Sequence, residues 1–133
     1  MNKLVVSGKR KTAIAKATIM EGTGIVTFNK KSLTFLSDLQ QLEISEPLVL
    51  AKKVLGDLKF DVNLNVKGGG LACQVEAGRL AIAKAIVKFS GDKNLKAVFL
   101  VYDKNLLVAD TRRKEACKPG DSKARAMRQS SFR

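Results

Sequence analysis

Apolar and polar residues alternate near the N-terminus in a pattern that predicts strands. A period of two runs through the stretch KTAIAKATI, where the small or branched residues at every second position are Ala13, Ala15, Ala17 and Ile19. Such alternation is typical of a strand with one buried face. Glycines within 21–24 indicate a turn, and the stretch IVTF at 25–28 indicates a further strand. We therefore expect residues 3–29 to form a β-hairpin.

The middle of the chain contains the two clearest patterns. Residues 58–67 predict a strand, because apolar and polar residues alternate there without a break. Its polar members are Asp61, Asn63, Asn65 and Lys67. Residues 71–93 predict a helix that stops near Gly91, because apolar residues recur there at helical spacing. A ridge of small side chains, which permits close packing, is formed by Ala77, Ala81 and Ala85.

The remaining elements are weaker. Residues 32–44 have a mixed pattern, and we interpret them as short turns. A helix is expected over 44–55, because Ser45 can cap it and Pro47 then falls in the first turn, where no amide donor is needed. Two further elements are expected, a helix over 94–103 and a short extended run over 105–110.

The organisation of the chain changes at Thr111. From there to the last residue the sequence has no Val, Ile or Leu, and eight Lys or Arg against two acids give this stretch a net charge of +6. Such a segment cannot offset its ordering entropy by burial, so it should order only on a partner. The chain is thus predicted to have an α/β domain at 1–110, with helices packed on a mixed sheet in two layers, and an extended basic C-terminal tail at 111–133.

The charge of the whole chain points to a polyanionic partner. Twenty-five Lys and Arg against twelve Asp and Glu give a net charge of +13, and the pI is near 10.1. A field of this sign favours polyanions, which include nucleic acid, acidic lipid and acidic protein, and of these we expect nucleic acid. The two cysteines are too few for a disulfide framework, and without histidine or a thiolate cluster we expect no metal and no cofactor. No signal peptide or membrane span is evident, so we expect a soluble, intracellular protein without a membrane partner.

The sharpest local motif is the triple glycine in VKGGGLACQ, between the predicted strand and helix. A dinucleotide fingerprint would need a third glycine at position 73, where Cys73 stands, and a phosphate-loop pattern is absent. A turn that packs closely, and that could also touch an RNA phosphate, suits Gly68, Gly69 and Gly70 better. Because histidine is absent and the acids are scattered, we expect no catalytic site and no enzymatic activity.

Basic residues form two further groups. Lys9, Arg10 and Lys11 are three consecutive cations, with Lys16 further along the same arm, so their side chains can reach a curved phosphate surface from several directions. The helix over 71–93 carries a second group, which is either an ordinary solvated face or a contact for a polyanion: Arg79, Lys84 and Lys88.

Three blocks of the sequence resemble the S-nine family of small-subunit ribosomal proteins, of the archaeal and eukaryotic type. They are GKRKTAIAKATIMEGTGIVTFN, then NVKGGGLACQVEAGRLAIAKAIV, in which Gln74 follows the glycines, and then LLVADTRRKEACKPGDSKARAMRQSSFR. With the linking segments, the resemblance covers essentially the whole chain. Departures from the family pattern are Cys73, where a smaller residue is usual, and three positions in the tail, Met127, Ser130 and Phe132.

The resemblance implies a fold like the second domain of ribosomal protein S-five and binding to rRNA in the head of the small subunit, beside neighbouring head proteins. It also implies a cytoplasmic place in the ribosome and a tail that ends near the tRNA in the peptidyl site. For rRNA the implied contacts are Lys9, Arg10, Lys11, Lys16, Arg112, Arg113, Lys123, Arg125 and Arg128. For tRNA they are Ser131, Phe132 and Arg133. A non-ribosomal nucleic-acid-binding protein is the main alternative, and a phosphoryl-transfer enzyme is a weaker one.

Overall fold

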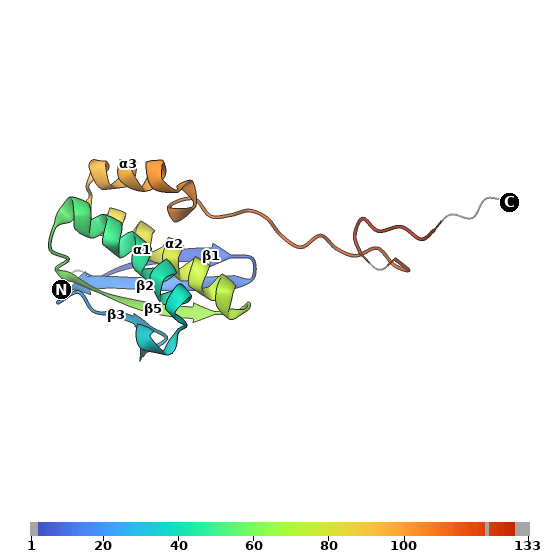
Figure 1. Cartoon of the computed structure of the whole chain (residues 1–133), viewed down its shortest axis with the longest axis horizontal. Coiled ribbons are helices and arrows are strands. Elements are labelled where there is room, and N and C mark those ends of the chain that lie inside the picture. The colour runs from blue at the N-terminus through green and yellow to red at the C-terminus, as the bar shows by residue number, and fades with distance from the viewer. Residues whose placement is uncertain (1–2, 122, 130–133) are drawn as a thin grey trace.

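In the computed structural model, which describes residues 3–121 and 123–129, one sheet is packed against helices and a tail extends away from them (Figure 1). The strands are β1 (Leu4–Arg10), β2 (Ala13–Glu21), β3 (Val26–Phe28), β4 (Lys31–Ser32) and β5 (Phe60–Lys67). The helices are α1 (Asp38–Leu55), α2 (Leu71–Ser90) and α3 (Lys93–Tyr102), with 3-10 turns at Leu33–Phe35 and Lys104–Leu106. The predicted α/β class, the strand at 58–67 and the helices at 71–93 and 94–103 are confirmed.

The sheet has the strand order β1-β2-β5-β3-β4. Strands β1, β2 and β5 are antiparallel neighbours, β3 runs parallel to β5, and the two-residue β4 pairs antiparallel with β3. A two-residue turn of Lys11 and Thr12 joins β1 to β2, and Lys11 has a positive φ of 50°. A second tight turn at Asn29 and Lys30 has positive φ at both residues, as a primed hairpin turn requires.

The predicted hairpin over 3–29 is wrong in its pairing, because β3 does not return along β2. One oxygen of the Asp61 carboxylate accepts hydrogen bonds from the backbone N–H groups of Thr23, Gly24 and Ile25, at 2.8 to 2.9 Å. This carries the chain across the end of β5, so that β3 joins the far side of that strand (Figure 1). The glycines at 21–24 therefore make a crossing loop, and the true hairpin is β1–β2.

Helix α1 begins at Asp38, seven residues before the predicted cap at Ser45. Ser37 precedes its first turn, and the backbone N–H of Ser37 donates to the side chain of Gln40. Pro47 lies inside the helix, where it removes one hydrogen bond, but its ring is fully buried. Burial of Pro47 thus lets the helix extend beyond the start that this proline indicated locally. Residues 38–44, which we interpreted as part of a run of turns, are therefore helical. The run predicted as extended at 105–110 also differs, because it starts with the 3-10 turn Lys104–Leu106.

The core lies between one face of the sheet and the helices α1 and α2. The predicted alanine ridge of α2 is fully buried, and α2 comes so close to β1 that a Cβ added at Gly8 would lie 2.5 Å from the carbonyl oxygen of Ala77. Helix α3 packs on α1 and α2 through the buried side chains of Leu95 and Phe99. Over the described residues, no helix covers the opposite face of the sheet (Figure 1).

The C-terminal part leaves the body as an extended chain (Figure 1). Between residues 109 and 121 it contains no helix or strand. A turn at Lys118–Asp121 is closed by a hydrogen bond from the Asp121 N–H to the Lys118 carbonyl, and Gly120 supplies its positive φ of 78°. Among the described residues, no helix is both long and apolar enough to cross a bilayer.

Candidate nucleic-acid interface

The face of the sheet that points away from the helices is polar and basic, and we term it the open sheet face. It is formed by alternate residues of β1, β2 and β5, which alternate with the buried ones. Its members are Val5, Ser7, Lys9, Ile14, Lys16, Thr18, Asn63, Asn65 and Lys67. An antiparallel sheet commonly has one face packed on the core and one face in solvent, and the solvated face then carries rows of polar residues.

The strand register sets these residues side by side. Lys16 lies between Ser7 on β1 and Asn65 on β5. In the next row, Lys9 and Lys67 lie on either side of Ile14. Because adjacent strands are about 4.8 Å apart, three lysines stand close to hydroxyl and amide groups on a surface about 10 Å wide, with the exposed Ile14 between Lys9 and Lys67. Ammonium groups suit phosphate, and hydroxyl and amide groups suit the 2′-hydroxyls of RNA.

A shallow hollow extends this face beyond the end of β3. Its lining includes Thr18, Asn63, Asn65, Lys67 and Lys30. Its edge is held by Asn29, whose side chain accepts a hydrogen bond from the Val66 N–H at 2.7 Å and donates to the Val66 carbonyl at 3.2 Å. This pairing replaces the strand ladder where β3 ends, and the turn holds Lys30 beside the hollow.

The acid on the polar side of β5 does not oppose this positive surface. The Asp61 carboxylate accepts the three backbone hydrogen bonds of the crossing loop, and the one from Ile25 is the main reason why the pKa of Asp61 lies below its ordinary value of 3.8. Its charge is therefore engaged by backbone dipoles at the end of the sheet. Gly22 gives it room, since a Cβ at that position would overlap the carboxylate.

More lysines line the outer edge of β1. Lys84 and Lys88 of α2 and Lys96 of α3 surround a hollow that also includes Ser7. The basic residues of α2 were interpreted either as a solvated face or as a contact for a polyanion, and the structure shows that they do not all behave alike. Lys84 and Lys88 gather with other cations, whereas Arg79 points elsewhere and forms ion pairs with Glu46 and Asp103, the latter at 3.0 Å.

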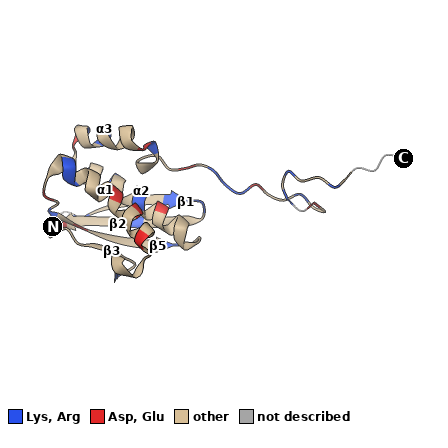
Figure 2. Ribbon diagram, viewed as in Figure 1, with Lys and Arg blue, Asp and Glu red and all other residues tan. Residues whose placement is uncertain are grey.

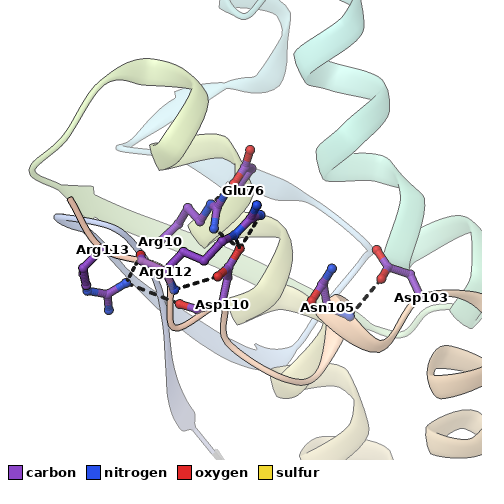
Figure 3. Close-up of polar contacts among 7 residues, drawn as sticks. All are labelled: Arg10, Glu76, Asp103, Asn105, Asp110, Arg112 and Arg113. Carbon is purple, nitrogen blue, oxygen red and sulfur yellow. Dashed lines mark hydrogen bonds and ion pairs between the residues drawn. The ribbon is translucent and has the colours of Figure 1, made fainter. Parts of the chain in front are cut away.

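Arg10, which the resemblance assigned to rRNA, is engaged inside the protein (Figure 3). Its guanidinium forms ion pairs with Glu76 of α2 and with Asp110, where the chain leaves the body. Only 17% of the side-chain surface of Arg10 is exposed. These contacts tie β1, α2 and the start of the tail together, so the structure gives Arg10 an anchoring role.

Arg112 binds the same carboxylate, and Arg113 binds backbone carbonyl groups beside it (Figure 3). Arg112 donates its backbone N–H and its guanidinium to Asp110, at 2.7 to 2.9 Å. This side-chain hydrogen bond is the main reason why the pKa of Asp110 lies far below its ordinary value, and the same contact raises the pKa of Arg112. Arg113 donates to the carbonyl oxygens of Asp110 and Arg112. Both guanidinium groups lie at the surface where the tail begins.

The cations further along the tail are mostly exposed, and some have acidic neighbours within it. Arg125 makes two hydrogen bonds with Glu115, at 2.9 and 3.2 Å, and Arg128 lies 3.6 Å from Asp121. Lys123 is exposed. The residues assigned to tRNA by the resemblance, Ser131, Phe132 and Arg133, lie outside the described residues.

The triple glycine is a tight junction between β5 and α2. A Cβ at Gly68 would lie 2.6 Å from the carbonyl oxygen of Thr12, and one at Gly69 would lie 3.1 Å from the Cβ of Ala13. Both glycines have positive φ, whereas Gly70 has open space around it. Gln74 donates from its side chain to the Gly68 carbonyl at 3.1 Å. The junction therefore packs against the β1–β2 turn and holds Lys11 and Lys67 at the same end of the sheet.

Charge is distributed unevenly over the molecule. Figure 2 shows basic residues along the tail, at the ends of β1 and β5 and at the C-terminal end of α1, whereas the acidic residues of α1 lie in its first half. Sequence reasoning missed Lys67, Asn63 and Asn65 as candidate contacts, although their alternation with buried residues already placed them on one face. It could not find the Arg10–Asp110 contact, because these residues are 100 positions apart.

Comparison with known proteins gives a consistent result. The sequence profile of the family described as "Ribosomal protein S9/S16" matches residues 8–133. The chain is 46% identical over 129 residues to "Small ribosomal subunit protein uS9" of Methanococcus vannielii and 47% identical to the protein of that name from Methanococcus maripaludis strain C5. Each alignment covers 95% of this chain and 95% of the relative.

These relatives are structural proteins of the ribosome and not enzymes, and rRNA binding is general among them. The alternatives of a phosphoryl-transfer enzyme and of an unrelated nucleic-acid-binding protein are therefore discarded. The chain belongs to the ribosomal protein S9/S16 family, as an archaeal-type constituent of the small ribosomal subunit.

Proposed function

We propose that the open sheet face and the lysines along the edge of β1 bind rRNA in the head of the small subunit. The observation that carries this proposal is the register that sets Lys9, Lys16 and Lys67 among hydroxyl and amide side chains on an uncovered face. A-form RNA offers phosphates and 2′-hydroxyls on a wide, shallow minor groove. A surface on which ammonium groups stand beside hydroxyl and amide groups matches that chemistry.

We further propose that residues 1–110 form the body and that residues 111–133 form a tail that runs along rRNA toward the tRNA in the peptidyl site. Lys123, Arg125 and Arg128 would contact rRNA phosphates, together with Arg112 and Arg113 where the tail begins. Ser131, Phe132 and Arg133 would be nearest the tRNA. The extended course of 109–121 and its anchoring through Asp110 support a tail that leaves the body in a fixed direction.

The sheet proposal is tested with the double variant Lys16→Gln/Lys67→Gln. Binding of the full-length protein to purified archaeal small-subunit rRNA is measured over a range of salt concentrations. The slope of log K against log salt is negative, and each lost phosphate contact makes it shallower by about 0.7 to 0.9. The slope of the double variant should therefore be shallower by about 1.5. The matched control is Lys52→Gln/Lys53→Gln on α1, which removes the same charge from two exposed lysines on the helical side.

We expect the control to keep the slope of the unmodified protein. Equal slopes for the two double variants would mean that rRNA responds only to the net charge, and the open sheet face would lose its assignment.

The tail proposal is tested by deleting residues 129–133. The core residues that the structure describes all precede residue 107, so the body should keep its midpoint of thermal unfolding and should still assemble into subunits. Binding of tRNA to the peptidyl site of those subunits should weaken. The single change Arg133→Ala should give a smaller loss, with a lower salt dependence of tRNA binding. Unchanged tRNA affinity in both variants would overturn the assignment of the terminus.

A further inference from the structure

A second surface of the protein is apolar and lies on the helical side, away from the open sheet face. We term it the outer helix surface. It is formed by adjacent stripes of α1 and α3, with Leu39, Leu42, Val49 and Leu50 on α1 and Val98, Val101 and Tyr102 on α3. The two stripes are continuous, because Leu50 and Tyr102 line both of the hollows that make up this surface.

Large apolar side chains are unusually exposed here. The exposed fractions are 67% for Leu39, 68% for Leu42 and 89% for Val101. Single exposed apolar residues are ordinary, but contiguous apolar patches on soluble proteins mark interaction sites. The stripes follow helical spacing, since residues three or four positions apart lie on the same side of each helix.

Helix α1 has apolar residues on two sides. Ile44, Pro47 and Ala51 face the core and are buried, whereas Leu39, Leu42 and Val49 are directed outward. A surface helix with one partner layer needs only one apolar stripe, and a helix that is apolar on several sides is normally covered on each. The outward stripe of α1 therefore indicates a second layer that is supplied by another molecule.

The charges around this surface indicate what that molecule is. Asp38 and Glu43 flank the apolar stripe of α1, and neither forms an ion pair within the described part of the chain. Glu46 is held by Tyr102, which donates its hydroxyl hydrogen, and by Arg79. No Lys or Arg occurs in α1 before Lys52. The first half of this helix is thus acidic in a chain with a net charge of +13.

We propose that the outer helix surface docks a basic protein of the small subunit, which covers the apolar stripes and pairs its Lys or Arg side chains with Asp38 and Glu43. RNA fits this surface poorly, because its lining is mostly apolar and Lys53 is its one cation beside the carboxylates of Glu43 and Glu46 in the described part of the chain. A second copy of this chain fits poorly, because two molecules with a charge of +13 repel each other. Apolar contact with charge complementarity around it is the usual anatomy of a protein interface.

The inference rests on the place of this family in the small subunit, but not on rRNA contact by the sheet or on the course of the tail. It is tested in purified small subunits that contain the full-length protein with a photoreactive benzoylphenylalanine at position 42 or at position 101. A third protein, labelled at position 16 on the open sheet face, tests the rRNA proposal separately. After irradiation, the cross-linked peptides or nucleotides are identified by mass spectrometry.

Cross-links from positions 42 and 101 to a Lys- or Arg-containing segment of one ribosomal protein are the expected result. Cross-links from these positions to rRNA or to a second copy of this chain would overturn the proposal, and so would labels that react only with solvent. Because the label at position 16 has its own readout, failure of the rRNA proposal is distinguishable from failure of the docking proposal.

A variant of the outer helix surface and a control elsewhere give a second readout. Leu42→Lys/Val101→Lys places two cations on the outer helix surface, where a basic partner would be repelled. The control is Ile25→Lys, which adds a cation at a position that is 60% exposed in the crossing loop. After subunits are washed in high salt, we expect retention of the double variant to fall about tenfold relative to the control. Equal retention of the two proteins would contradict the proposal.

Discussion

The open sheet face and the outer helix surface lie on opposite sides of one small body, and their chemistry is nearly reversed. On the sheet, lysines stand among Asn, Ser and Thr, and the acid of β5, Asp61, is engaged by backbone N–H groups. On the helices, Leu and Val side chains are exposed beside carboxylates without a cationic partner in the described residues. The difference teaches that a net charge of +13 does not make every surface of this protein an RNA surface.

The two helices packed on the sheet make this separation possible. Alternation along the strands directs lysines away from the core, and α1 and α2 fill the other side. A helix layer and the sheet, each about 10 Å thick, lie between the outward apolar stripe of α1 and the open sheet face, but Glu43 and Glu46 reach a hollow at the edge of β1 that Lys9 also lines. The two faces are thus separated by both layers, and the hollow beside β1 is where their charges come near each other.

The largest effect is expected from Gly8→Ala, which disturbs the layer that both surfaces share. The added Cβ would lie 2.5 Å from the Ala77 carbonyl and 2.8 Å from the Ala81 nitrogen, so α2 must move away from β1. Overpacking of this kind costs about 1–3 kcal/mol, measured as the free energy of unfolding in urea. The control is Gly70→Ala, where nothing lies within 4 Å of the new Cβ. Equal losses in both variants would show that close packing at Gly8 is not limiting.

A smaller effect separates the two surfaces in the isolated protein. Leu42→Lys/Val101→Lys should raise the affinity for purified small-subunit rRNA only slightly, through the added net charge. The slope of log K against log salt should stay the same, because the new lysines contact no phosphate. The measurement is a salt titration of rRNA binding. A slope that steepens by about 1.5 would mean that RNA also binds the helices, and the comparison of the two surfaces would fail.

The smallest effect concerns Asp61 at the end of the sheet. Its pKa lies below 3.8, mainly through the hydrogen bond from Ile25. The folded state therefore favours the ionised form of the carboxylate more than the unfolded chain does. This contribution to stability is complete above the ordinary pKa and is lost as the pH falls through the lowered value. The stability difference between the unmodified protein and Asp61→Asn should therefore be constant near neutral pH and shrink below about pH 4. A difference that is independent of pH over this range would contradict the assigned role.

Much of the body was predictable from local pattern. The alternation at 60–67 and the helical spacing at 71–90 are long and unbroken, so they outweigh competing signals. Helix α1 was harder to predict, because Pro47 is a strong local signal for a helix start, and only the burial of its ring explains why the helix continues through it. The strand order failed for a similar reason, since the contact of Asp61 with the crossing loop spans more than 35 positions in the sequence.

The candidate interface shows the same division. Lys9 and Lys16 were identified as basic residues of one arm, and the register then added Asn65 and Lys67 from a strand about fifty positions away. Arg10 was grouped with its neighbours by sequence, but the fold brings Glu76 and Asp110 to it. A run of basic residues does not reveal that one of its cations forms ion pairs with two carboxylates inside the protein.

The sequence by itself determined the composition of each element, the change of character at Thr111 and the family, because these depend on neighbouring residues and on motifs in order. The tertiary structure alone decided which polar residues share a face, where β3 pairs and how Asp110 anchors the tail. Periodicity fixes the direction of a side chain relative to its own strand or helix. Which residues of other elements it then meets depends on loop crossings and packing, and these are properties of the whole fold.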